Sequence, residues 1–225
     1  MEPKLRKLIL FGPPGVGKGE QATRLKHAFH FAHLSTGEIL REEIKNETEL
    51  GLKVKRAVES GEFVDDDTVI GIIVNQIDRP EFAIGFILDG FPRNLNQARR
   101  LDEILAERGN KIDCALSISA PDEVTVERLS GRRICAKCSA TYHVVNKKPK
   151  VDGVCDLCEG KVILRKDDAP QKQEERLKAY FEQTKPLADY YRAAGTLKDI
   201  NGDQSIDEVS AEISEWLCNP GTNGA

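Results

Sequence analysis

The sequence predicts an α/β fold with a parallel sheet flanked by helices, and three observations support this prediction. Short apolar runs alternate with segments long enough to form helices, which is the pattern of strands joined by helical crossovers. The first apolar run leads directly into a glycine-rich loop. Between residues 131 and 168 the helical patterning fades and paired cysteines occur, which indicates a small β-rich insertion.

Four strands and four helices are predicted along the chain. The strands are the apolar runs 8–11, 86–88, 115–118 and 197–200. The helices are the segments 17–29, 94–108, 121–129 and 169–194. Asn94 is a favourable N-cap for the second helix, and Pro186 interrupts the fourth helix, which we expect to bend at Lys185.

The composition is typical of a globular protein. Of 225 residues, 40% are hydrophobic and 31% are charged, so a single domain with insertions can bury its own core. No apolar run approaches the roughly 20 residues of a membrane span, and no signal-peptide core is visible. We therefore expect a cytoplasmic protein without a membrane partner. The net charge of -4 provides no overall attraction to nucleic acid, so nucleic acid is not an expected partner either.

Residues 12–18, with the sequence GPPGVGK, match the phosphate-binding pattern G-x-x-x-x-G-K between a predicted strand and a predicted helix. Glycines let backbone N–H groups turn toward phosphate oxygens, and Lys18 adds a positive charge. The fold should therefore be P-loop NTPase-like and bind a nucleoside triphosphate. Gly19 follows the lysine where most P-loop proteins carry the Ser or Thr that binds Mg²⁺, so Mg²⁺ must be held in another way.

Four of the six cysteines form two Cys-x-x-Cys pairs, at Cys135 and Cys138 and at Cys155 and Cys158. Residues 139–154, which are sixteen residues, separate the pairs, a spacing typical of a tetrahedral four-cysteine zinc site. We interpret the zinc as structural, although thiolate sites also accept iron or cobalt and a redox role is an alternative. The remaining two, Cys114 and Cys218, are expected to be inert thiols.

Three segments resemble the adenylate kinase family: GPPGVGKGEQA at 12–22, LSTGEILR at 34–41 and GFILDGFPR at 85–93. The resemblance covers roughly residues 8 to 217. It implies transfer of the γ-phosphoryl group of MgATP to AMP, giving two ADP, in a monomer with an arginine-rich closing lid. It also implies a core at 1–34, 65–130 and 169–225, a helical insertion at 35–64 that binds the nucleoside monophosphate, and a zinc-binding lid at 131–168.

The resemblance also assigns nucleotide contacts to residues of this chain. The implied ATP-binding residues are Gly12, Pro13, Pro14, Gly15, Val16, Gly17, Lys18, Gly19, Glu20, Arg128, Arg132, Thr141, Tyr142 and Gln204. The implied AMP-binding residues are Thr36, Arg41, Glu62, Phe63, Val64, Gly90, Arg93, Gln97, Arg165 and Arg176.

The implied catalytic residues are cationic except for one aspartate: Lys18, Arg93, Arg128, Arg165, Arg176 and Asp89. Asp89, at the carboxyl end of a predicted strand, is expected to organise Mg²⁺ through water. Arg128 and Arg132 are four residues apart, and we expect them to share one helical face.

None of the four histidines is expected to act in catalysis. His27, His30 and His33 follow one another near the end of the first helix and the next strand, where capping or surface placement is the usual explanation. His143 is expected to lie in the stem of the lid rather than to bind metal.

Two residues depart from the family pattern. Glu20 stands where the family usually has Thr, in the first turn of the phosphate-binding helix. A carboxylate there favours the helix dipole by about 0.3–1 kcal/mol, so we expect it to stabilise the fold and to weaken ATP binding. Phe63 replaces an aliphatic residue or tyrosine, and Val64 after it should still offer its backbone to adenine.

Two alternatives remain open. A kinase for another monophosphate, such as UMP or CMP, would share the loop and the arginines, but Thr36, Gln97 and the long lid favour AMP. A zinc-ribbon binding module is the other alternative, because lysines at 147, 148 and 150 lie between the cysteine pairs.

Overall fold

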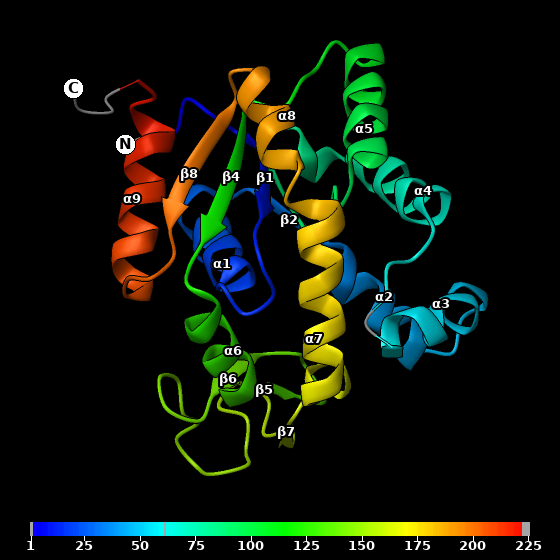
Figure 1. Cartoon of the computed structure of the whole chain (residues 1–225), viewed down its shortest axis with the longest axis vertical. Coiled ribbons are helices and arrows are strands. Elements are labelled where there is room, and N and C mark those ends of the chain that lie inside the picture. Colours follow the sequence, from blue (N-terminus) through cyan, green and yellow to red (C-terminus); the bar gives the residue numbers. More distant parts are fainter. Residues whose placement is uncertain (1, 61, 222–225) are drawn as a thin grey trace.

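The computed structural model describes residues 2–60 and 62–221. Residue 1, residue 61 of the expected insertion and residues 222–225 of the last core segment lie outside the described residues. A parallel sheet runs through the molecule in the order β2-β3-β1-β4-β8 (Figure 1). Its strands are β1 (Lys7–Phe11), β2 (Ala32–Ser35), β3 (Phe86–Asp89), β4 (Cys114–Ser119) and β8 (Leu197–Asn201). All four strands predicted with bounds are confirmed, and β2 lies where a strand was expected after the first helix without assigned bounds.

Helices cover both faces of this sheet. They are α1 (Lys18–Phe29), α2 (Thr36–Lys45), α3 (Glu49–Ser60), α4 (Asp66–Ile77), α5 (Leu95–Glu107), α6 (Asp122–Gly131), α7 (Pro170–Ala179), α8 (Leu187–Ala193) and α9 (Ile206–Cys218). Short helical turns lie at η1 (Pro80–Phe82), η2 (Lys166–Asp168) and η3 (Tyr180–Thr184).

The side chains of β1 explain the layers, because successive residues of a strand face opposite sides. Leu8 and Leu10 belong to a buried cluster that includes residues of α1 and α9. Ile9 and Phe11 belong to a second buried cluster with residues of α4, α5 and α8. The strand therefore reads as a continuous apolar run because it is buried on both faces.

The predicted helix boundaries hold at α5 and at the interrupted helix. The Asn94 side chain accepts a hydrogen bond from the Gln97 backbone, so it caps α5 as expected. The predicted helix 169–194 breaks where Pro186 lacks an N–H group, and a π-helical turn, η3, absorbs the break. Thr184 in this turn donates a hydrogen bond to the backbone oxygen of Arg93, 2.7 Å away, which ties the turn to the core.

A second, antiparallel sheet forms most of the segment 131–168, the expected lid, away from the main sheet (Figure 1). It consists of β5 (Arg132–Cys135), β6 (Thr141–His143) and β7 (Val162–Ile163), in the order β6-β5-β7. Its buried cluster contains only Cys135, Tyr142 and Cys155 among the described residues. The expected β-rich insertion is confirmed, and apolar burial alone is too small to hold it.

The expectation that Arg128 and Arg132 share a helical face is wrong. Helix α6 ends at Gly131, and the backbone of Arg132 is extended, with φ -67° and ψ 139°. Arg132 instead pairs with His143 as the first residue of β5. Strand pairing in the second sheet requires an extended backbone at Arg132, and α6 therefore ends at the residue before it.

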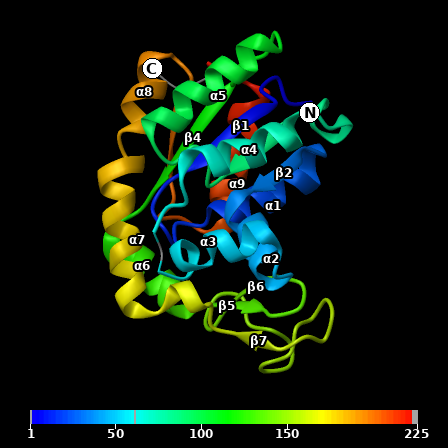
Figure 2. The same cartoon turned by 90° about the vertical axis from the view of Figure 1, so that its right-hand side faces the viewer.

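The helices α2 and α3 form a hairpin that lies above the lid in the side view (Figure 2). Within residues 2–60 and 62–221, none of the helices combines the length and the apolar character that a membrane span requires.

Candidate active site

The phosphate loop links β1 to α1 and has a backbone that only glycine adopts easily. Gly12, Gly15 and Gly17 have φ values of 152°, 88° and 102°. A Cβ atom on Gly12 would lie 2.1 Å from the backbone oxygen of Ile118, and one on Gly15 would lie 2.4 Å from that of Thr125. The loop is therefore packed against β4 and α6, and no side chain caps the start of α1. The free N–H groups of this helix end can bind an anion.

Lys18 lies over the loop that precedes it. Its Nζ donates to the backbone oxygens of Gly12, at 2.8 Å, and Pro13, at 2.9 Å. Burial is the main reason that the pKa of Lys18 is lowered to about 7, although the charge of Asp89 acts in the opposite direction. A bound phosphate group would give the Lys18 ammonium an anionic partner in place of these two carbonyl oxygens.

Asp89 lies at the end of β3, next to the start of α1, as predicted. A Cβ atom on Gly19 would be 3.5 Å from Asp89 Oδ2. The Asp89 carboxylate therefore lies close to the position at which most P-loop proteins carry a Ser or Thr hydroxyl. Burial raises the pKa of Asp89, but the neighbouring His33 and the charge of Lys18 outweigh it and lower the pKa below its usual value. The carboxylate is therefore ionised and can hold a hydrated cation.

His33 lies closer to the site than the sequence suggested. Its Nε2 is 3.6 Å from Asp89 Oδ2, and its side chain is only 9% exposed. The sequence interpretation of a capping or surface histidine is wrong for His33, because β2 pairs with β3 and brings residue 33 beside the sheet end. The alternation of apolar and polar residues over positions 32–35 is the sequence signal that could have placed His33 on a strand.

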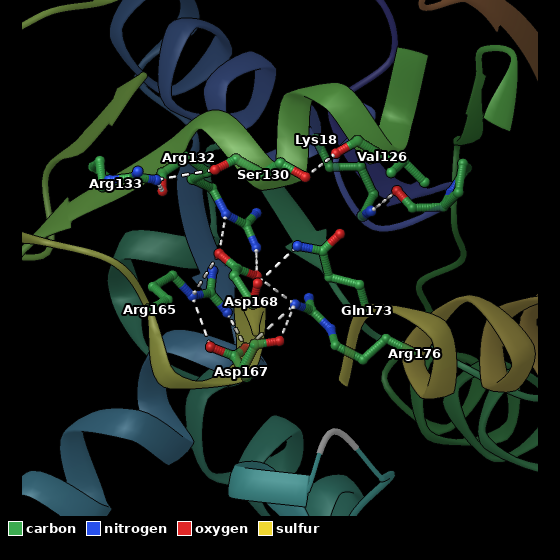
Figure 3. A network of polar contacts seen from close by, with 11 residues as sticks. Lys18, Val126, Ser130, Arg132, Arg133, Arg165, Asp167, Asp168, Gln173 and Arg176 are labelled. Carbon is green, nitrogen blue, oxygen red and sulfur yellow. Dashed lines mark hydrogen bonds and ion pairs between the residues drawn. The ribbon is translucent and has the colours of Figure 1, made fainter. Parts of the chain in front are cut away.

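Three arginines surround two adjacent aspartates (Figure 3). Arg132 donates through Nε to Asp168 at 2.7 Å, and Arg176 donates to the same carboxylate at 2.7 Å. Arg165 donates through Nε to Asp167 at 3.0 Å. The Asp168 side chain is fully buried, with 0% exposure. Sequence reasoning missed both aspartates, although they follow Arg165 almost directly in the chain.

The electrostatics of this cluster favour anions. Burial is the main reason that the pKa of Arg176 is lowered to about 10; Arg165 and Arg132 contribute to this lowering, and the charge of Asp167 acts in the opposite direction. Burial raises the pKa of Asp167, but Arg165 outweighs that effect and holds the pKa well below its usual value. The two carboxylates offset only part of the charge of the three arginines, and phosphate oxygens could take over the same donors.

A second group of predicted residues surrounds Arg93. Its Nε donates to the Gly90 backbone oxygen at 2.8 Å, and Thr36 Oγ1 donates to the same oxygen at 2.9 Å. Its guanidinium lies over the Phe63 ring, 4.9 Å from the centroid. Gln97 accepts from the Arg93 backbone N–H at 2.7 Å and is 1% exposed. These contacts fix the direction of the guanidinium.

Arg41 has no carboxylate within ion-pair distance among the described residues. Burial is the main reason that its pKa is lowered to about 9, and the charge of Arg165 adds to the effect. The charges of Asp167 and Glu38 act in the opposite direction from beyond ion-pair distance, so the buried guanidinium is a suitable ligand for phosphate.

Two cavities collect the predicted site residues. The larger one has a volume of about 850 Å³, and all predicted ATP-binding residues except Pro13 line it. The smaller one, of about 60 Å³, is lined by every predicted AMP-binding residue except Gly90, which lines the larger cavity. Arg93, Arg165 and Arg176 line both. The size of the larger cavity suits small-molecule ligands.

Arg128 joins the lid stem to the loop before α9. It donates to the backbone oxygens of Gly202, at 2.7 Å, and Gln204, at 3.4 Å. His143 lies in the stem as expected: its Nδ1 accepts from the backbone of Val145 at 3.1 Å, and a Cβ on Gly131 would clash with its ring.

The four cysteines of the two pairs converge. Their Sγ atoms all lie within 4.8 Å of one another. Cys135 Sγ and Cys158 Sγ are 3.5 Å apart, and Cys138 Sγ and Cys155 Sγ are 3.6 Å apart. Zinc–sulfur bonds of about 2.3 Å in a tetrahedron require a similar separation, so the residues fit zinc.

Hydrogen bonds to sulfur support this fit. Backbone N–H groups of Lys137 and Leu157 donate to Cys135 and Cys155, at 3.3 and 3.4 Å. The Tyr142 hydroxyl donates to Cys155 Sγ at 3.3 Å and is the main reason that the pKa of this thiol is lowered to about 6. Tyr142 also lines the larger cavity, so it connects the cysteine cluster to the predicted ATP site.

The other two cysteines lie in the core of the protein. Both Cys114 and Cys218 are buried, and burial raises the pKa of Cys114 to about 11. A thiol that stays protonated is unreactive, which agrees with the expected inert role.

The parallel sheet, the phosphate loop and the cavity together define a protein of the P-loop nucleotide-binding class. The sequence model of one family, described as adenylate kinase, matches residues 10–196. The adenylate kinase of Carboxydothermus hydrogenoformans is 48% identical over 211 residues, which are 94% of this chain and 99% of that protein. That of Methanothrix thermoacetophila is 47% identical over 210 residues, 93% of this chain and 97% of that protein. The chain belongs to the adenylate kinase family.

Proposed function

We propose that the protein transfers the γ-phosphoryl group of MgATP to AMP and releases two ADP. The observation that carries this proposal is the pair of adjoining cavities that share Arg93, Arg165 and Arg176. The larger cavity contains the phosphate loop, the smaller one contains Thr36, and Arg41 lines both. Cations common to both suit a reaction that joins two phosphate chains.

This reaction requires little covalent chemistry from the protein. The phosphate of AMP, with a second pKa near 6, is mostly dianionic at pH 7 and can attack without a base. What remains is to align two polyanions and to neutralise their charge. Arg165 and Arg176 would exchange their contacts with Asp167 and Asp168 for phosphate oxygens, while Arg41 and Arg93 hold the acceptor phosphate.

Lys18 and the loop N–H groups would hold the β- and γ-phosphates of the donor. Asp89 would hold the magnesium ion of MgATP through water, and that ion would neutralise charge on the transferred group. Arg128, fixed by the oxygens of Gly202 and Gln204, would approach from the lid stem. Removing a transition-state arginine costs about 10³-fold or more in turnover.

We further propose that residues 131–168 cover the donor and that residues 35–64 bind the acceptor. A cover over the site excludes the water that would hydrolyse ATP. Zinc at the four cysteines would be structural, because all four ligands come from the protein and leave no open position. Its role would be to replace the apolar core that the lid lacks.

Two further properties are proposed from the family alone. We propose that the protein acts as a monomer and in the cytoplasm. Size-exclusion chromatography with light scattering would test the first, and a mass near twice the chain mass would contradict it.

The test of the function is ADP formation from ATP with AMP, UMP, CMP or GMP as acceptor, in the presence of Mg²⁺. Selective turnover with AMP is the expected outcome. Turnover with UMP or CMP instead would assign the protein to another monophosphate. No turnover, together with salt-dependent binding to a polyanion, would favour the zinc-ribbon alternative. Metal analysis of the same sample should give about one zinc per chain.

A further inference from the structure

One ion pair joins the lid directly to the phosphate-binding helix. Lys147 Nζ lies 2.8 Å from Glu20 Oε2, although 127 positions separate the two residues in the chain. Lys147 follows β6 in the lid, and Glu20 lies in the first turn of α1. Both residues line the larger cavity.

The carboxylate of Glu20 is held from the core side as well. Arg24, one turn further along α1, has its Nε 3.4 Å from Glu20 Oε1. The same guanidinium donates to Asp207 at the start of α9, at 2.6 Å. The charges thus alternate along Lys147, Glu20, Arg24 and Asp207, and they link the lid to two helices of the core. The carboxylate of Glu20 is therefore held in a fixed direction by contacts of the core as well.

Lys147 is also presented in a fixed direction. Its backbone forms a bridge with His143, whose N–H donates to the Lys147 oxygen at 2.9 Å. The His143 ring accepts hydrogen bonds from Val145 and Asn146, at 3.1 and 3.2 Å, so the loop is closed on itself. Because this loop follows β6 and pairs back with it, the ion pair of Lys147 connects the sheet of the lid to α1.

We propose that Lys147 is a positioning residue, which holds the lid over the bound ATP through its ion pair with Glu20. This role rests on the proposed function only in that ATP is the donor. It also reverses the expectation drawn from the sequence: Glu20 strengthens ATP binding instead of weakening it, because Lys147 and Arg24 offset its charge. The Glu20 side chain is 22% exposed and that of Lys147 is 46% exposed, so the effect should be modest and sensitive to salt.

The test compares Lys147→Met, Lys147→Arg, Glu20→Gln and the double variant Glu20→Gln with Lys147→Met. The matched control is Lys148→Met, because Lys148 is exposed and forms no ion pair with the part of the chain that the structure describes. The dissociation constant of MgATP and the KM values for ATP and AMP are measured at low and at high salt.

At low salt, Lys147→Met and Glu20→Gln should each weaken MgATP binding by about two- to five-fold, with a much smaller change in the KM for AMP. The double variant should be no weaker than either single variant, and Lys147→Arg and Lys148→Met should match the parent protein. At about 1 M salt the differences should fade, because the Debye length falls to about 3 Å.

Two results would overturn the proposal. Tighter MgATP binding by Glu20→Gln would restore simple repulsion between the carboxylate and the nucleotide. Additive losses in the double variant would show that the two residues act separately. A parent protein that binds MgATP but forms no ADP with AMP would contradict the proposed function instead, and the binding comparison would still decide the role of Lys147.

Discussion

At the scale of single residues, the cationic side chains of the cavity pair with oxygen atoms of the protein itself. Lys18 donates to backbone oxygens, and Arg176 donates to Asp168. Burial makes the charged form of Lys18 costly, and this cost is relieved when an anion arrives. Nucleotide binding should therefore change protonation as well as contacts.

Binding of MgATP at pH 8 is expected to take up close to one proton. The pKa of Lys18 is lowered to about 7, mainly by burial, so at pH 8 its amine is mostly neutral. A neighbouring triphosphate favours the ammonium form and raises this pKa, so a proton is taken up. At pH 6 the amine is already charged, and the uptake should fade.

Calorimetric titrations in two buffers with different ionisation enthalpies measure this uptake. Equal binding heats in both buffers at pH 8 would contradict the prediction.

Phe63 provides a second test at this scale. Its ring lies against the Arg93 guanidinium, 4.9 Å from ring centroid to Cζ, within the range of a cation–π contact. Phe63→Leu should raise the KM for AMP by about two- to five-fold, because it frees a guanidinium that should bind the acceptor phosphate. Phe63→Tyr keeps the ring and should retain the parent value. An equal rise in the KM for ATP would show a general loss of structure instead.

At the scale of elements, the sequence predicted what local patterns determine. The P-loop needs glycines and a strand–helix context, and α5 needs Asn94 at its start; both are visible within a few residues. The strand pairing of Arg132 with His143 is not local. The prediction that Arg128 and Arg132 share a helical face therefore extended the helical spacing past Gly131, where α6 ends. His33 was misjudged for the same reason, since only the pairing of β2 with β3 brings it to Asp89.

The cysteine cluster gives a prediction about one element, the lid. Tyr142→Phe removes the hydroxyl that donates to Cys155 Sγ and that accepts from the Asp156 backbone at 2.7 Å. Loss of such a hydrogen bond next to a metal ligand weakens metal binding by about 10- to 100-fold. Zinc release to a chromogenic chelator should therefore be faster in this variant.

Tyr190→Phe is a suitable control, since Tyr190 donates to Asp102 in the core, far from the cysteines in sequence. Unchanged zinc release in Tyr142→Phe would mean that the hydroxyl serves only the backbone of Asp156.

At the scale of the whole molecule, the segments 35–64 and 131–168 contact each other as well as the core. Lys45, at the end of α2, donates to the backbone oxygen of Lys137 in the lid at 3.3 Å. Lys172, in α7, donates to the backbone oxygen of Glu59 in α3. Helix α2, which lines the smaller cavity, therefore touches the segment 131–168 that borders the larger one. Binding on one side should then affect the other.

Lys45→Met is expected to reduce the coupling between the two nucleotides. In the parent protein, AMP should tighten the binding of a non-hydrolysable ATP analogue, and the analogue should tighten AMP by the same factor. Lys45→Met removes the contact between α2 and the segment 131–168, so both factors should fall together by about two-fold, with each nucleotide alone binding as before. Lys53→Met is the matched control, because Lys53 lies in the same insertion and donates to Thr68 outside the lid. If Lys45→Met weakened either nucleotide alone and left the coupling factor intact, the contact would serve the insertion itself and not its communication with the lid.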